Sequence, residues 1–141
     1  MDSVPDRNLA LELARVTEAA AMAAGRWMGR GRPEAADQAA ADAMRLVLDS
    51  VEMDGIIVIG EGDERPTPLL YSGEPLGTGH PPQVDIAVDP IDGTALLALG
   101  RSGALAVVAV SERGTMYEPH QIRYMDKIAV GPEAAGAIDI N

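Results

Sequence analysis

Cysteine is absent from this 141-residue sequence, which excludes disulfide bonds, thiolate metal sites and a cysteine nucleophile. Aromatic residues are scarce, at 3% with no phenylalanine, so the core must be built from Leu, Val, Ile, Met and Ala. The N-terminus lacks the basic and apolar segments of a secretory signal, and no apolar run reaches the length of a membrane span. We therefore expect a cytoplasmic protein with no membrane partner.

Positive charge is also in short supply. Eleven Lys and Arg residues face 22 Asp and Glu residues, which gives a net charge of −11 and disfavours nucleic acid as a partner. An anionic substrate would then need a metal ion to screen its charge. The length and the ordinary content of apolar residues, 47%, predict one globular domain over residues 1–141.

The most informative segment, residues 84–94, is an apolar run that ends in two carboxylates, a glycine and a hydroxyl. Its pattern predicts a strand that leads into a tight loop, with Asp89 and Asp92 at the carboxyl end of the strand. Carboxylate oxygens suit Mg²⁺ or Mn²⁺, Gly93 lets the backbone approach a ligand, and Thr94 can present its hydroxyl or amide to a phosphate. The alternative is that these residues form an ordinary turn with Thr94 as a helix cap.

A second acidic loop favours the first interpretation. Residues 56–59 form a continuous apolar run, typical of a buried strand, and Glu61 follows between two glycines. Flanking glycines suit a backbone held close to a ligand, although an exposed acidic loop would have a similar sequence. Two predicted strands therefore end in acidic loops.

Two helices are predicted before these strands. The first covers residues 8–30, and the second runs from residue 34 to about residue 51 with Pro33 as its first residue. Asp37 falls in the first turn of the second helix, where the helix dipole alone would favour a carboxylate.

The remaining segments complete a layered fold. A short helix follows Thr94, His80 and His120 are expected at the surface, and residues 73–82 are expected to form a loop. Further strands are expected at residues 69–71, 104–110 and 124–130, with a turn at residues 112–114. This order predicts an α/β or α+β fold in which two N-terminal helices pack on a mixed sheet.

The segment Asp89-Pro90-Ile91-Asp92-Gly93-Thr94 resembles the signature of the metal-dependent, lithium-sensitive sugar phosphatase superfamily. Within that superfamily, several motifs in the same order resemble class II fructose-1,6-bisphosphatase. They lie at residues 27–31, 36–40, 59–62, 84–94, 104–110 and 125–132.

This resemblance implies a sugar-phosphatase-like fold and a gluconeogenic reaction, the Mn²⁺- or Mg²⁺-dependent hydrolysis of the 1-phosphate of fructose 1,6-bisphosphate. Asp37, Glu61 and Asp89 match metal ligands of the family, and Asp92 is a fourth candidate from the residue pattern. Asp92, Gly93 and Thr94 match its phosphate-side loop. Thr94 matches a threonine that orients or activates the attacking water, and Tyr124 matches a tyrosine that contacts the sugar phosphate.

The sequence departs from the family pattern at several of these motifs. Pro33 and Glu34 replace a lysine and an asparagine, Arg65 replaces an aspartate that could assist Thr94, and Ala95 replaces a polar residue. Loss of a general-base partner typically slows a reaction about 10²- to 10⁴-fold. Independent turnover is therefore expected to be impaired.

Family chains are more than twice as long, and their second half supplies a further metal-binding glutamate and basic residues for the distal phosphate. We therefore expect residues 1–141 to be an incomplete, N-terminal portion of the fold without that half. Three hypotheses follow: a phosphatase of this family, a binding module or regulatory partner of a full-length homologue, and a non-functional gene fragment. Because two halves share an interior in this superfamily, we expect exposed apolar surface and either homo-oligomers or association with a complementary half or a full-length homologue.

Overall fold

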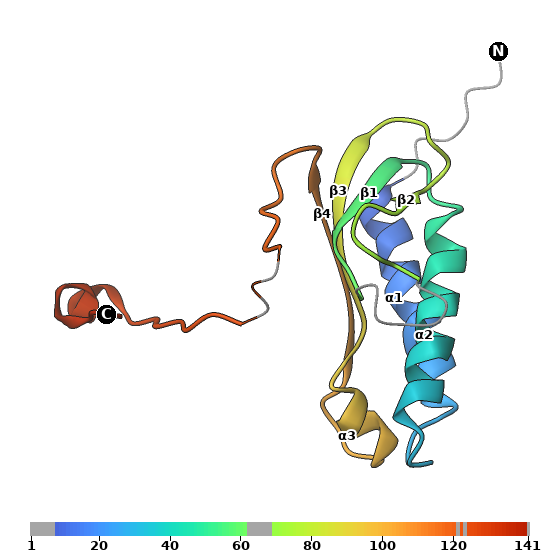
Figure 1. Ribbon diagram of the computed structural model, residues 1–141, viewed down its shortest axis with the longest axis horizontal. Helices are drawn as coiled ribbons and strands as arrows, with labels where there is room; N and C mark the ends of the chain where they lie inside the picture. The colour runs from blue at the N-terminus through green and yellow to red at the C-terminus, as the bar shows by residue number, and fades with distance from the viewer. Residues whose placement is uncertain (1–7, 62–68, 121, 123, 141) are drawn as a thin grey trace.

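Two long helices pack against one face of a four-stranded mixed sheet (Figure 1). This computed structural model describes residues 8–61, 69–120, 122 and 124–140. Arg65, which replaces an aspartate of the family pattern, lies outside the described residues. Within the described residues, no helix is both long enough and apolar enough to cross a membrane. The predicted α/β architecture is confirmed.

Helices α1 (Leu9–Gly25) and α2 (Pro33–Leu48) follow the predicted periodicity. Both end earlier than predicted, α1 five residues before Arg30 and α2 three residues before Val51. The Asn8 side chain caps α1 by accepting a hydrogen bond from the Leu11 amide, and Pro33 occupies the first turn of α2 as expected. Both buried faces are rich in alanine, which lets the two helix axes approach closely. The buried residues are Leu13, Val16, Ala20 and Ala24 on α1, and Ala36, Ala40, Ala41, Met44 and Leu48 on α2.

The sheet has the order β2–β1–β3–β4. The central strands β1 (Asp54–Ile59) and β3 (Gln83–Asp92) are parallel, which brings their carboxyl ends to the same edge of the sheet. Antiparallel partners flank them, β2 (Pro75–Leu76) beside β1 and β4 (Leu105–Glu112) beside β3.

The end of β3 is irregular where the predicted site begins. The pairing of β3 with β4 shifts register between Asp89 and Asp92, and Pro90 in this interval has no amide hydrogen to donate to the ladder. The strand nevertheless extends as far as Asp92, so Asp89 and Asp92 both lie at its carboxyl end, as predicted. Helix α3 (Thr94–Ala98) follows after one glycine, as predicted.

The helices cover only one face of the sheet (Figure 1). Along β1 the side chains alternate in burial, and Ile59 is 39% exposed, so the prediction of a continuously buried strand at residues 56–59 is wrong. Leu105 and Val107 of β4 are exposed in the same way. The expected exposure of apolar sheet surface is confirmed.

Three local expectations are corrected. Residues 69–71 form no strand, because Leu70 has a positive φ of 56° that interrupts extended backbone. The predicted loop at residues 73–82 contains the short strand β2, which pairs with β1. Residues 124–130 form no strand either, because none of the described strands pairs with them, and they lead to a 3₁₀ helix, η1 (Pro132–Ala137).

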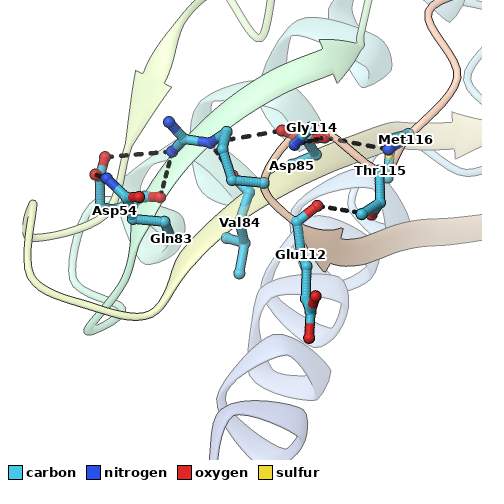
Figure 2. Close-up of polar contacts among 9 residues, drawn as sticks. Asp54, Gln83, Val84, Asp85, Glu112, Gly114, Thr115 and Met116 are labelled. Atoms are coloured by element: carbon cyan, nitrogen blue, oxygen red, sulfur yellow. Dashed lines mark hydrogen bonds and ion pairs between the residues drawn. The ribbon is translucent and has the colours of Figure 1, made fainter.

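A polar network fixes the turn that follows β4 (Figure 2). The Asp85 carboxylate is 3% exposed and accepts hydrogen bonds from the Gly114 and Met116 amides, at 2.7 and 3.1 Å. Arg113 lies 3.5 Å from the other Asp85 oxygen and donates to the Asp54 carbonyl oxygen at 2.6 Å. The buried charge is therefore compensated, and the start of the C-terminal segment is held against β3.

Candidate functional site

The predicted carboxylates come from three elements that meet near one end of the sheet. Glu61 lies two residues beyond β1, and Asp89 and Asp92 lie at the end of β3. Asp37 lies in α2, early in the helix. The parallel pairing of β1 and β3 explains why Glu61 and the two aspartates face the same edge of the sheet.

The environment of Asp89 perturbs its pKa. Its carboxyl is half-buried, and this burial raises its pKa above the ordinary value. The negative charge of Asp92 raises the pKa further, as does that of Asp37, against a smaller opposing hydrogen bond from the Ile91 backbone. The charges of Asp92 and Asp37 therefore oppose ionisation of Asp89, and a cation bound nearby would relieve this repulsion.

The four predicted ligands do not form one compact centre. Across the described ranges, no group of three or more His, Asp or Glu side chains converges closely enough to hold a metal ion. The carboxylate oxygens of Asp37, Asp89 and Asp92 are of the type that Mg²⁺ and Mn²⁺ prefer. Their side chains are not close enough together in this structure to form a complete coordination shell.

Glu61 lines a hollow at the end of β1. Its amide donates to the Leu70 carbonyl oxygen at 2.9 Å, which fixes the backbone just beyond β1. The hollow measures about 300 Å³ and also contains His120, whose side chain is exposed as expected. The sequence gives no sign of this proximity, because His120 is far from Glu61 along the chain. The other lining residues are Val58, Ile59, Gly60, Ser72, Glu118, Pro119 and Ile122.

The backbone of the predicted phosphate loop requires glycine. Gly93 has a φ of 92°, and a Cβ atom there would lie 3.3 Å from Leu96 Cδ1. The Gly93 carbonyl oxygen accepts hydrogen bonds from the Leu96 and Leu97 amides and so starts α3. This geometry explains the turn between the two candidate residues Asp92 and Thr94.

The Thr94 hydroxyl donates its proton to the Ile91 carbonyl oxygen at 3.1 Å. With that proton engaged, the lone pairs of the Thr94 oxygen remain able to accept a hydrogen bond from a water molecule. The geometry therefore suits a residue that orients a water and does not suit one that donates a proton to it.

Tyr124 lies away from these groups. Its side chain is 93% exposed, in a segment that extends from the body of the molecule (Figure 1). The structure does not bring Tyr124 to Asp89 or Thr94, and its contact with a sugar phosphate stays a prediction.

The Gly-Arg-Gly segment before α2 has a structural explanation. The Gly29 and Gly31 amides donate to the carbonyl oxygens of Leu97 and Ala98, both at 2.9 Å, so the segment is tied to α3. Arg30 and Arg32 extend over the Trp27 ring, with their guanidinium carbons 5.9 and 5.5 Å from its centroid. Two residues that depart from the family pattern lie on the neighbouring helices, Glu34 on α2 and Ala95 on α3. Both are exposed.

The model of the family described as "Bacterial fructose-1,6-bisphosphatase, glpX-encoded" matches residues 7–141. This chain belongs to that family. It is 52% identical over 135 residues to "Fructose-1,6-bisphosphatase 1 class 2" of Escherichia coli (strain K12), and equally to "Fructose-1,6-bisphosphatase class 2" of Escherichia coli O6:H1 and of Shigella flexneri. The suspected resemblance is thereby confirmed.

The match covers 96% of this chain and 40% of each of these relatives. The chain thus spans well under half the length of the curated relatives that it matches.

Proposed function

We propose that this chain carries the metal-binding part of a class II fructose-1,6-bisphosphatase, which hydrolyses fructose 1,6-bisphosphate to fructose 6-phosphate and phosphate in gluconeogenesis. The observation that carries the proposal is the environment of Asp89, whose half-buried carboxyl lies within the field of Asp92 and Asp37. Membership of the family and 52% identity to class 2 enzymes support the choice of substrate.

Asp37, Asp89, Asp92 and Glu61 are the proposed metal ligands. Mn²⁺ or Mg²⁺ bound there would neutralise phosphate charge and lower the pKa of a coordinated water. Binding requires Asp89 to be ionised, which its burial and the charges of Asp92 and Asp37 oppose until a cation is bound.

Thr94 is the proposed positioning residue for water. Its hydroxyl proton is held by Ile91, so its oxygen accepts from the attacking water and directs a lone pair of that water toward phosphorus. Asp92 and Gly93 lie beside it in the proposed phosphate loop. Thr94→Ser retains the hydroxyl, whereas Thr94→Val removes the acceptor at similar volume, so activity should survive only the first change.

The candidate residues of the substrate side carry no positive charge. The net charge of −11 opposes a bisphosphate, and neither phosphate has an assigned basic partner among the candidate residues. We therefore propose that hydrolysis involves a complementary half or a full-length homologue, with Tyr124 meeting the sugar phosphate in that assembly. A cytoplasmic location accords with this role.

A second candidate function is a metal or phosphosugar binding module that regulates a complete homologue. It is favoured by the 93% exposure of the Tyr124 side chain, together with the replacements at Pro33 and Ala95. A gene fragment with no function would bind neither metal nor homologue.

Phosphate release from fructose 1,6-bisphosphate with Mn²⁺ tests these functions. The chain is assayed alone and mixed with the class 2 relative of Escherichia coli, beside Asp89→Asn and the exposed control Asp126→Asn. Release abolished only by Asp89→Asn supports an enzyme. Altered activity of the relative without release by the chain supports the binding module, and no effect in either assay contradicts both.

A further inference from the structure

The segment that leads into β2 runs alongside β1 and is tied to it. The Ile57 amide donates to the Glu74 carbonyl oxygen at 3.0 Å, and the Ser72 hydroxyl donates to the Val58 carbonyl oxygen at 3.1 Å. The Glu74 side chain in turn accepts a hydrogen bond from Arg45 of α2 at 2.6 Å. The segment is therefore held by both layers of the fold, the sheet and the helices.

Leu70 is the anchored residue of this segment that contacts Glu61. Its side chain is fully buried, and its backbone has a φ of 56°, which leucine rarely adopts. Such a conformation persists only where the surrounding contacts determine it. The Leu70 carbonyl oxygen accepts a hydrogen bond from the Glu61 amide at 2.9 Å, so an anchored group sets the backbone at Glu61.

Gly60 leaves the space that this carbonyl group occupies. A Cβ atom at residue 60 would collide with the Leu70 carbonyl oxygen and would lie 2.9 Å from Ile57 Cγ2. Gly60 does not have a positive φ, so its backbone conformation is open to other residues. Glycine is therefore required at this position for space, and the group that needs the space is the bonding partner of Glu61.

Gly55, on the same strand, provides a comparison. A Cβ atom there would lie 2.5 Å from Ile86 Cδ1 and 3.1 Å from the Leu76 carbonyl oxygen. The nearer neighbour is the end of a side chain, which can rotate away. At Gly60 the obstacle is a backbone oxygen, which can move only if its hydrogen bond with the Glu61 amide bends or breaks.

We propose that Gly60 is a positioning residue for Glu61 and acts through the Leu70 carbonyl oxygen. The hydrogen bond to Leu70 orients the Glu61 amide plane and with it the direction in which the Glu61 side chain leaves the backbone. The carboxylate then loses less conformational freedom when it binds a cation. This inference rests on the proposed function of Glu61 as a ligand of Mn²⁺ or Mg²⁺.

Calorimetric titration with Mn²⁺ tests the inference on the parent chain and on Gly60→Ala, Glu61→Gln and the double variant. Gly60→Ala should weaken binding at least tenfold. The double variant should bind no more weakly than Glu61→Gln alone, because a displaced carboxylate has no contribution left to lose. Gly55→Ala is the matched control, since it also crowds β1, and its Mn²⁺ affinity should stay within twofold of the parent value.

Hydrogen exchange of backbone amides tests the contact in the presence of a chelator. Gly60→Ala should speed exchange of the Glu61 amide at least tenfold, whereas the Ile57 amide should remain protected and thereby show that the variant is folded. Leu70→Ala is a second variant that removes the buried anchor without adding an atom near residue 60. It should change Glu61 exchange and Mn²⁺ affinity in the same directions as Gly60→Ala.

The outcomes separate this inference from the proposed function. If Glu61→Gln weakens Mn²⁺ binding but Gly60→Ala and Leu70→Ala do not, the inference is overturned and the ligand assignment stands. Fast exchange of the Glu61 amide in the parent chain would also overturn the inference. Equal Mn²⁺ affinity of the parent and Glu61→Gln would overturn the ligand assignment and the inference that rests on it.

Discussion

At the scale of single residues, the repulsion around Asp89 predicts a gain in stability when its charge is removed. Its pKa is raised in the folded chain, so the folded chain holds the proton more tightly than the unfolded chain does. The contribution of Asp89 to the free energy of unfolding is therefore fully present below its ordinary pKa of 3.8. It is lost as the pH rises through the raised pKa of the folded chain.

In the presence of a chelator, Asp89→Asn should accordingly raise the thermal midpoint at pH 7, and the gain should disappear below about pH 4. Asp126→Asn, at an exposed position, controls for the change in net charge. Equal midpoints for Asp89→Asn and the parent chain at pH 7 would show that the carboxylates do not repel one another.

Gly93 is the second residue with a local prediction. Gly93→Ala places a side chain at a φ of 92° and 3.3 Å from Leu96 Cδ1, which should cost about 1–3 kcal/mol of unfolding free energy. Gly136→Ala is the control, since no atom lies within 4 Å of the added carbon. Urea denaturation measures both, and a cost below that of the control would contradict the assigned strain.

At the scale of elements, one ion pair joins α2 to the segment that enters β2. Arg45 Nε donates to Glu74 Oε1 at 2.6 Å, the pair raises the pKa of Arg45, and the Glu74 side chain is only 5% exposed. Arg45→Met leaves this buried carboxylate without its cation and should cost about 2–3 kcal/mol. Asp49→Asn removes only the exposed ion pair of Arg45, so its cost should stay below about 1 kcal/mol. Equal costs in urea denaturation would refute this difference.

Elements with strong local signals could be predicted from the sequence. The period of apolar residues gave both helices, and the acidic loops gave the ends of β1 and β3. Strand β2 and the unpaired state of residues 124–130 could not be foreseen, because strand formation depends on partners distant in sequence. The turn at Leu70 was missed for a related reason, since leucine carries no signal for positive φ.

The sequence predicted which residue types make up the candidate site better than it predicted how these residues are arranged in space. The charges of Asp92 and Asp37 both raise the pKa of Asp89, whereas the assignment of these residues as metal ligands stays a prediction. The hollow that holds Glu61 with His120, and the bond from Thr94 to Ile91, arise from tertiary contacts and backbone geometry that no local pattern encodes.

At the scale of the whole molecule, the central claim is that an acidic chain of this family uses Asp89 and its neighbours to hold a divalent cation. Calorimetric titration with Mn²⁺ tests it most directly, on the parent chain, Asp89→Asn and the control Asp126→Asn. The account predicts saturable binding to the parent and to the control, with affinity at least tenfold weaker for Asp89→Asn. Equal binding by all three chains, or no binding by the parent chain, would contradict it.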